Sequence, residues 1–161
     1  MLKIFNSLEL FFEDVFVEIS VREYAKLKNI SPPTASKLLK DFAKEGLLIE
    51  NQRGIYIYFR ANRESNLFKD LASAYWRNKL YNLFQDIHDK FLYKQLILFG
   101  SIAKTENTIK SDVDIYVDLP KKKIDLNIIE KKLKRNIQIH FREQTKNVNL
   151  YKNIKKGLII I

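Results

Sequence analysis

The stretch Leu96-Ile97-Leu98-Phe99-Gly100-Ser101 and the triplet Asp112-Val113-Asp114, which follows after ten residues, decide the fold of this chain. The first stretch is an apolar run that ends in Gly-Ser. The triplet opens a second apolar run, from Ile115 to Leu119. Because alternate residues of a strand share a face, the two carboxylates are expected to point the same way. Like charges held together need a cation, and carboxylate oxygens suit Mg²⁺, so the sequence predicts a metal site.

The Gly-Ser pair predicts a site for phosphate beside the carboxylates. Gly100 allows the backbone to approach a phosphate closely, and Ser101 can donate to it at a helix start, where backbone N–H groups are free. Lys104 and Lys110 lie in the following loop, where they either neutralise phosphate charge or remain solvated.

The string from Gly100 to Val117 resembles the DNA polymerase β-like nucleotidyltransferase superfamily, especially its minimal nucleotidyltransferase branch. Ala103 and Ser111 also match that pattern. The resemblance implies a domain that binds Mg²⁺ and an NTP and transfers a nucleoside monophosphate to an acceptor. The implied catalytic and metal-binding residues are Asp112 and Asp114, and the implied nucleotide-binding residues are Gly100, Ser101 and Lys104.

The sequence departs from the family pattern at two positions. Thr105 stands where many members have a Gly, which is a modest change in a loop. Gln138 stands where many members have a third Asp that completes the metal site. An amide is neutral and cannot act as a base, so metal–nucleotide binding is better supported than turnover. His140, two residues further along the same strand, and Glu143 are the alternative candidates for a base or ligand.

The N-terminal third predicts a helix, a turn, a second helix and a hairpin. Ser20-Val21-Arg22-Glu23 is a capping box, and Ser31-Pro32-Pro33 starts the second helix, which Gly46 ends. Residues 47–50 and 55–60 are two β-runs around a predicted turn at 51–54. This order of elements is that of a winged helix-turn-helix domain.

The second helix resembles the recognition helix of bacterial and archaeal winged-helix regulators, over Pro32-Pro33-Thr34-Ala35-Ser36-Lys37-Leu38-Leu39. The resemblance implies binding to double-stranded DNA, with this helix in the major groove. The expected DNA-binding residues are Thr34, Ser36, Lys37, Lys40 and Arg53. Winged helices also serve as protein-interaction modules, and residues 1–64 hold 10 Lys and Arg against 9 Asp and Glu, a net charge of only +1.

Composition and charge narrow the class of protein. The chain has 161 residues, a net charge of +10 and no Cys, so a disulfide framework and a thiolate zinc site are excluded. The basic excess lies in residues 65–161, which suits a polyanionic ligand. No apolar run approaches the ~20 residues of a membrane span, and the start of the chain is unlike a signal peptide. We therefore expect a cytoplasmic protein without a membrane partner.

The predicted fold is α+β in two parts. Residues 1–63 form the winged helix-turn-helix domain, and residues 64–161 form a connecting helix and a small mixed sheet with helices on one face. The leading function is nucleotidyl transfer to an unknown acceptor. The alternatives are a DNA-binding transcriptional regulator with a degenerate nucleotide-sensing or dimerising domain, and an antitoxin that pairs with a toxin-like protein.

Overall fold

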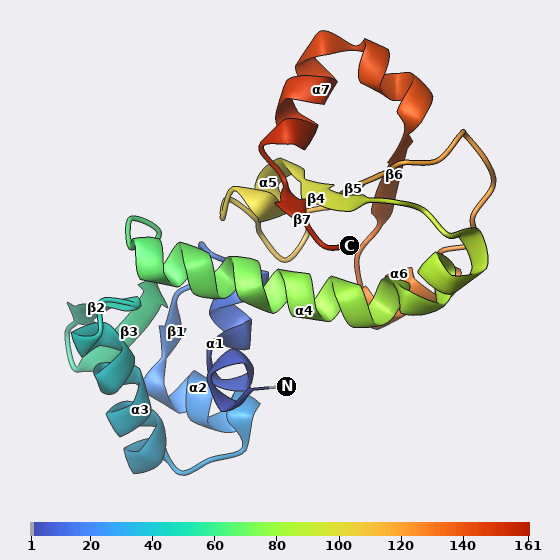
Figure 1. Ribbon diagram of the computed structural model, residues 1–161. Coiled ribbons are helices and arrows are strands. Elements are labelled where there is room, and N and C mark those ends of the chain that lie inside the picture. The colour runs from blue at the N-terminus through green and yellow to red at the C-terminus, as the bar shows by residue number, and fades with distance from the viewer. Residues whose placement is uncertain (1) are drawn as a thin grey trace. The chain divides into compact units, whose positions relative to one another are not determined.

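The computed structural model describes residues 2–161, apart from the side chain of Lys90 (Figure 1). The chain forms two compact units, Met1–Ala72 and Ser73–Ile161, and the division falls inside helix α4 (Asn66–Phe91). The predicted connecting helix is therefore present. The division into domains at residues 63 and 64 stays a prediction.

The first unit alternates helices with short antiparallel strands, and its sheet has the order β1-β3-β2. Its elements before α4 are α1 (Lys3–Glu13), β1 (Ile19–Ser20), α2 (Val21–Lys28), α3 (Pro32–Lys44), β2 (Leu48–Arg53) and β3 (Tyr56–Ala61).

Local sequence signals set the ends of α2 and α3. Ser20 and Glu23 form the predicted capping box, in which the Glu23 carboxylate accepts from Ser20 N at 2.8 Å. Asn29 ends α2 in the left-handed conformation, with φ 51°. Ser31 Oγ then accepts from Thr34 N and caps α3. The predicted capping box at Ser20 and the helix start at Ser31 are confirmed.

The turn between β2 and β3 lies later than the sequence indicated. Arg53 pairs with Tyr56, so only Gly54 and Ile55 connect the strands, and the predicted turn at 51–54 is wrong. Gly54 has φ 61°, the conformation that a two-residue turn requires. The polar residues before Gly54 remain in β2 because this part of the hairpin is largely exposed. An exposed strand can contain polar side chains.

The core of the first unit is built from large aromatic and aliphatic side chains on separate elements. Phe12 of α1 packs on Phe68 of α4, with ring centroids 5.3 Å apart. Leu39 of α3 and Phe59 of β3 are fully buried with them in the same unit. Helices α1, α3 and α4 and strand β3 therefore each contribute large apolar side chains to the core of this unit, and β2 contributes Leu48.

The second unit contains a four-stranded mixed sheet with the order β6-β5-β4-β7. Only the pair of β5 and β6 is parallel. The elements are β4 (Leu96–Phe99), α5 (Gly100–Ala103), β5 (Val113–Val117), α6 (Asn127–Leu133), β6 (Ile137–Phe141), the 3₁₀ helix η1 (Arg142–Lys146), α7 (Val148–Lys155) and β7 (Leu158–Ile159). The mixed α+β class is confirmed.

Helix α7 covers one face of this sheet. Ile97, Phe99 and Tyr116 share that face, and Ile154 of α7 packs with them, flanked by Leu150. The intervening residues of the strands point to the opposite face because side chains alternate along a strand.

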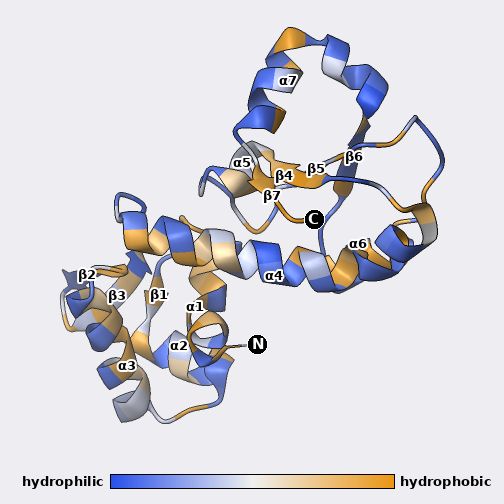
Figure 2. Cartoon of the chain, in the orientation of Figure 1, coloured by the Kyte–Doolittle hydropathy of each residue, from blue (hydrophilic) through white to orange (hydrophobic). Residues whose placement is uncertain are grey.

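The opposite face is also covered. Leu96, Leu98 and Ile115 are fully buried there, and Figure 1 shows α4 and α6 on that side. Arg77 of α4 donates from Nε to the Ile159 carbonyl of β7 at 2.9 Å. The prediction of helices on one face is therefore wrong. β4 and β5 are apolar on both faces, as their colour in Figure 2 shows, because helices cover both.

Within residues 2–161, none of the helices is both long enough and apolar enough to cross a membrane.

Candidate functional site

The acidic pair lies at the start of β5, the second strand from the edge of the sheet. Asp114 pairs with Phe99 on β4 and with Gln138 on β6, and Val113 between the two acids is buried. Asp112 immediately precedes the strand. The alternation of strand side chains therefore places both carboxylates on the face that carries Phe99, away from α4.

Gly100 brings the backbone at the end of β4 directly against Asp114. A Cβ at Gly100 would overlap Asp114 Oδ2, and φ is 78°, in the left-handed region. Ser101 follows in α5, and its carbonyl accepts from Glu106 N at 2.9 Å. Lys104 is the C-cap residue of α5 and is exposed. The structure thus brings the predicted Gly-Ser turn and the acidic pair together.

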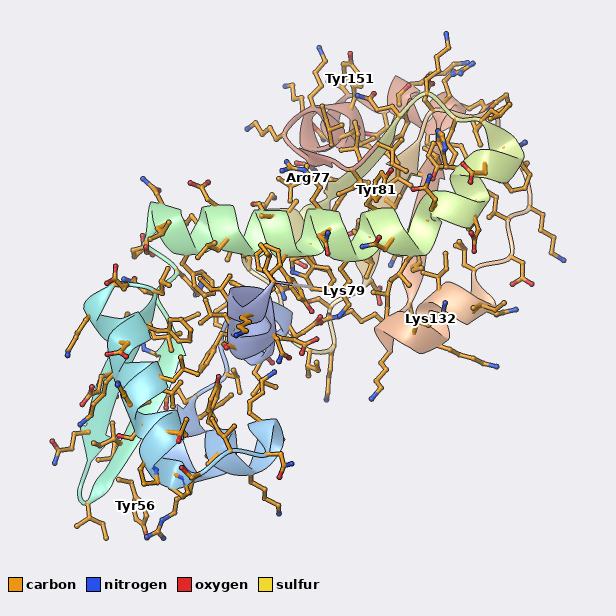
Figure 3. All side chains as sticks on the ribbon, turned by 60° about the horizontal axis from the view of Figure 1, so that its bottom comes forward. Tyr56, Arg77, Lys79, Tyr81, Lys132 and Tyr151 are labelled. Carbon is orange, nitrogen blue, oxygen red and sulfur yellow. The ribbon has the colours of Figure 1, made fainter. Side chains whose placement is uncertain are left out.

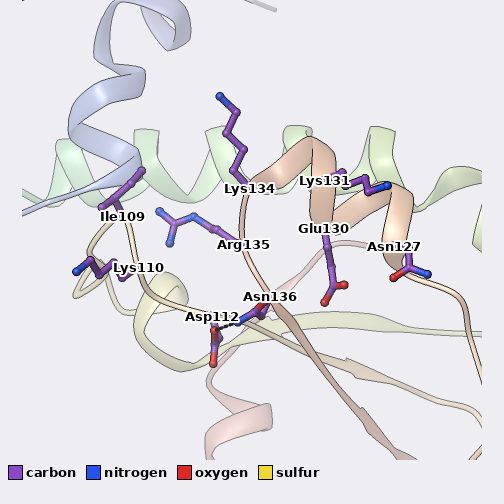
Figure 4. A pocket seen from close by; sticks show the side chains of 9 residues that line it. All are labelled: Ile109, Lys110, Asp112, Asn127, Glu130, Lys131, Lys134, Arg135 and Asn136. Carbon is purple, nitrogen blue, oxygen red and sulfur yellow. Dashed lines mark hydrogen bonds between the residues drawn. The ribbon is translucent and has the colours of Figure 1, made fainter.

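Two amide side chains hold the carboxylate of Asp112. Gln138 Nε2 donates to Oδ2 at 2.7 Å, and Asn136 Nδ2 donates to Oδ1 at 3.4 Å. Figure 4 shows the second of these bonds. The position of the third carboxylate in the family pattern is therefore occupied by an amide that donates to the first.

The environment shifts the pKa values of Asp114 and His140 in opposite directions. Burial raises the pKa of Asp114, the nearby His140 lowers it, and the charge of Asp112 raises it further. Burial lowers the pKa of His140 although the Asp114 carboxylate opposes this. Among the described residues, His140 Nδ1 is buried and has no hydrogen-bond partner. His140 therefore lies beside Asp114 with one ring nitrogen that makes no hydrogen bond within the described residues.

Glu143 lies away from the acidic pair. It belongs to η1, beyond the far end of β6, where its carboxylate accepts from Lys121 N at 3.0 Å. Because β5 and β6 are parallel, the end of β6 is remote from the start of β5. Of the two alternative candidates for a base, the structure brings only His140 to the site.

Arg135 organises the loop before the acidic pair, a role that the sequence reasoning missed. Its guanidinium is buried and donates from Nη1 to the carbonyls of Thr108, at 2.8 Å, and Ser111, at 2.6 Å. It also lies over the ring of Trp76, 5.5 Å from its centroid. Ser111 Oγ accepts from Thr108 N at 2.9 Å and so caps this loop.

The loop after α5 keeps a conformation that favours glycine. Thr105 has φ 59° and is buried, and its backbone N donates to the Ile102 carbonyl at 3.1 Å. A β-branched residue rarely adopts this conformation. Thr105 therefore keeps the left-handed backbone conformation that the Gly of the family pattern would favour.

The acidic pair fits a metal ion that arrives with a phosphate ligand. In the part of the chain that the structure describes, no three His, Cys, Asp or Glu side chains form a closed metal cluster. Mg²⁺ is commonly bound by one or two carboxylates, with substrate phosphates and waters as the remaining ligands. Asp112 and Asp114 provide that donor set, next to a backbone turn without a side chain at Gly100.

The residues expected to contact DNA lie on α3 and at the end of β2. Thr34, Ser36, Lys37 and Lys40 are on α3, and all but the half-buried Ser36 are exposed. Arg53 is the last residue of β2, where its guanidinium pairs with Glu18 at 2.6 Å and lies over the ring of Tyr58. A contact of Arg53 with DNA would therefore compete with an existing ion pair.

The comparisons with known proteins identify the family of the chain. Residues 80–161 match the family model described as nucleotidyltransferase domain, and this match covers just over half of the chain. It includes every strand of the mixed sheet and both acidic residues. No curated protein and no solved structure matches the chain. On the strength of the family match, this chain belongs to the nucleotidyltransferase domain family.

Proposed function

We propose that this protein binds an NTP together with Mg²⁺ and transfers a nucleoside monophosphate to an acceptor hydroxyl. One observation carries the proposal. The carboxylates at the start of β5 lie beside a turn whose missing side chain, at Gly100, leaves the backbone against Asp114. A metal–phosphate ligand needs this combination of anionic oxygens and open backbone.

Each residue of the site has a distinct role in the proposal. Asp112 and Asp114 hold the metal, which would neutralise charge on the triphosphate. Gly100 and Ser101 present the backbone and hydroxyl to the leaving phosphates, and Lys104 adds a positive charge at the end of α5. His140 would accept a proton, because it lies beside Asp114 and burial lowers its pKa.

The test is nucleotide binding and transfer by the purified protein. Each NTP is titrated with Mg²⁺ and with EDTA, and mass spectrometry then detects a transferred nucleotide on added acceptors. Asp112→Asn with Asp114→Asn should abolish metal-dependent binding and transfer. Asp125→Asn, an exposed carboxylate on the loop before α6, is the matched control. If the double variant binds and transfers like the wild type, the proposal is wrong.

A nucleotide sensor is the second candidate, and Gln138 favours it. Its amide donates to Asp112 where a carboxylate would complete the acidic site. Metal-dependent binding without transfer to any acceptor supports the sensor. Metal-dependent binding with transfer supports the enzyme and makes Gln138 a tolerated substitution.

We further propose that the first unit is a winged helix-turn-helix that binds double-stranded DNA. The support is its element order and the capped, exposed helix α3 that follows a short turn after α2. The contacts would come from Thr34, Ser36, Lys37, Lys40 and Arg53. Lys37→Ala with Lys40→Ala should weaken DNA binding and reduce its salt dependence, whereas Lys26→Ala on α2 should not. Equal binding by both variants would contradict this role.

A further inference from the structure

A cavity of about 560 Å³ lies beside Asp112 (Figure 4). It is open to solvent and is bordered by the loop before β5, by α6 and by the segment that joins α6 to β6. Cations outnumber acids in its lining: Lys110, Lys131, Lys134 and Arg135 against Asp112 and Glu130, with Ile109, Asn127 and Asn136 completing the wall. A cavity of this size and charge suits a small anionic group.

The two acidic residues of the lining already have hydrogen-bond partners. Glu130 Oε1 accepts from Ile137 N at 2.8 Å, and Asp112 accepts from the two amides described above. Lys110, Lys131 and Lys134 are exposed, and Figure 4 shows their side chains extending outward from the residues around the cavity. The cavity therefore offers positive charge to a ligand.

The sheet places this cavity and the Gly-Ser turn on opposite sides of the acidic pair. Gly100 follows β4, and Asn136 precedes β6, while β5 lies between these strands. Because Asp114 pairs with Phe99 and Val113 pairs with Ile137, both neighbours meet β5 at the same end. Across the sheet, the acidic pair therefore lies between the Gly-Ser turn and the cavity.

In-line transfer needs this order. The attacking hydroxyl and the leaving pyrophosphate lie on opposite sides of the α-phosphorus. If the triphosphate tail occupies the turn at Gly100, the acceptor must approach from the side of β6, where the cationic cavity lies.

We propose that this cavity binds the acceptor, and that the acceptor carries phosphate close to its attacking hydroxyl. This inference rests on the proposed transferase function. The acceptor oxygen forms a bond to the α-phosphorus, and the bond from the α-phosphorus to the bridging oxygen breaks. Pyrophosphate leaves with that electron pair, and the hydroxyl proton passes to His140, the base of the proposed function. Either the end of a nucleic acid strand or a free nucleotide has the required chemistry.

The first measurement is binding, which does not depend on turnover. A fluorescein-labelled trinucleotide with a 5′-phosphate is titrated against the full chain by anisotropy. Lys110→Ala with Lys131→Ala should weaken binding about 10-fold and reduce the salt slope by about 1.4, the value for two lost phosphate contacts to a single strand. Lys123→Ala with Lys132→Ala removes the same charge outside the cavity and should leave binding unchanged. Lys132 lies on α6 next to Lys131 but is absent from the lining (Figure 3).

The second measurement is transfer from an NTP to three acceptors with the same hydroxyl. These are the trinucleotide, a nucleoside monophosphate and a nucleoside without phosphate. The proposal is supported if the wild type prefers either phosphorylated acceptor and the cavity variant loses that preference. The loss should be a raised KM for the acceptor, with the KM for NTP unchanged. The size of the product distinguishes a strand end from a free nucleotide.

Two outcomes would overturn the acceptor site while leaving the transferase intact. One is equal transfer to all three acceptors, and the other is a cavity variant that raises only the KM for NTP. Conversely, selective loss of trinucleotide binding in the cavity variant, without transfer by any variant, supports the anion site and contradicts the transferase.

Discussion

The missing side chain at Gly100 determines whether the backbone can lie against Asp114. We expect Gly100→Ala to lower stability by about 1–2 kcal/mol, because L-residues disfavour this left-handed conformation. Its Cβ would also displace the Asp114 carboxylate. A displacement of this kind is expected to lower kcat/KM for transfer about 100-fold.

The matched control is Gly54→Ala. Gly54 also has a positive φ, 61°, but a Cβ there would meet nothing within 4 Å. This variant should lose a similar amount of stability in chemical denaturation and keep wild-type transfer. Equal activity of the two variants would show that the contact between Gly100 and Asp114 is unimportant for the reaction.

Substitution of Gln138 should have opposite effects on stability in the metal-free and the metal-bound protein. Gln138→Glu replaces an amide that donates to Asp112, at 2.7 Å, with a like charge. In EDTA we expect a loss of about 1 kcal/mol, because this hydrogen bond is exposed and solvent screens the charges. Mg²⁺ should then raise the Tm of this variant more than that of the wild type, because a third carboxylate strengthens the site.

Thermal unfolding in EDTA and in increasing Mg²⁺ measures this difference. Gln138→Met removes the hydrogen bond without adding charge, so it should lose stability without gaining a response to Mg²⁺. An identical Mg²⁺ dependence of wild type and Gln138→Glu would contradict a metal site at Asp112.

At the scale of elements, one ion pair connects the end of β5 to η1. Arg142 Nε donates to Asp118 Oδ1 at 2.7 Å, and this hydrogen bond lowers the pKa of Asp118, against the effect of burial. A carboxyl with a lowered pKa in the folded state stabilises the protein above its unfolded pKa, near 3.8, and loses that contribution as pH falls through the folded value.

Asp118→Asn should therefore be less stable than the wild type at pH 7, and the difference should shrink below about pH 3.8. Denaturant unfolding at a series of pH values measures this difference. Adding Arg142→Gln to the variant should have little further effect, since its partner is already gone. A difference that is independent of pH would show that the ion pair does not contribute.

At the scale of the whole molecule, two compact units share helix α4, and their unfolding can be followed separately. Leu39 is fully buried in the first unit, so Leu39→Ala should lower the stability of that unit by about 2–5 kcal/mol. Trp76, the single Trp, is buried in the second unit and reports on it by fluorescence.

We expect Leu39→Ala to shift the circular dichroism transition to lower denaturant while the Trp76 transition and NTP binding stay unchanged. Leu98→Ala, in the buried strand β4, should shift the Trp76 transition instead. Equal shifts of both transitions by both variants would mean that the units unfold as one.

The parts of the site that the sequence predicted are local. Asp112 and Asp114 are two residues apart, so strand alternation alone places their side chains together. Ser20 and Ser31 cap the helices that follow them for the same reason, since a cap needs only the next three residues. The turn at Gly54 was misplaced because an exposed strand tolerates polar residues that resemble a loop.

Interactions between distant segments decided the rest. The sequence by itself determined the helix caps and the acidic pair, because each depends on neighbours within a few residues. Only the tertiary structure revealed that Gln138 donates to Asp112, that Arg135 holds the loop before it, and that α7 covers the second face of the sheet. These features require residues far apart in the chain to meet, and that depends on the order of strands in the sheet, which short-range periodicity does not encode.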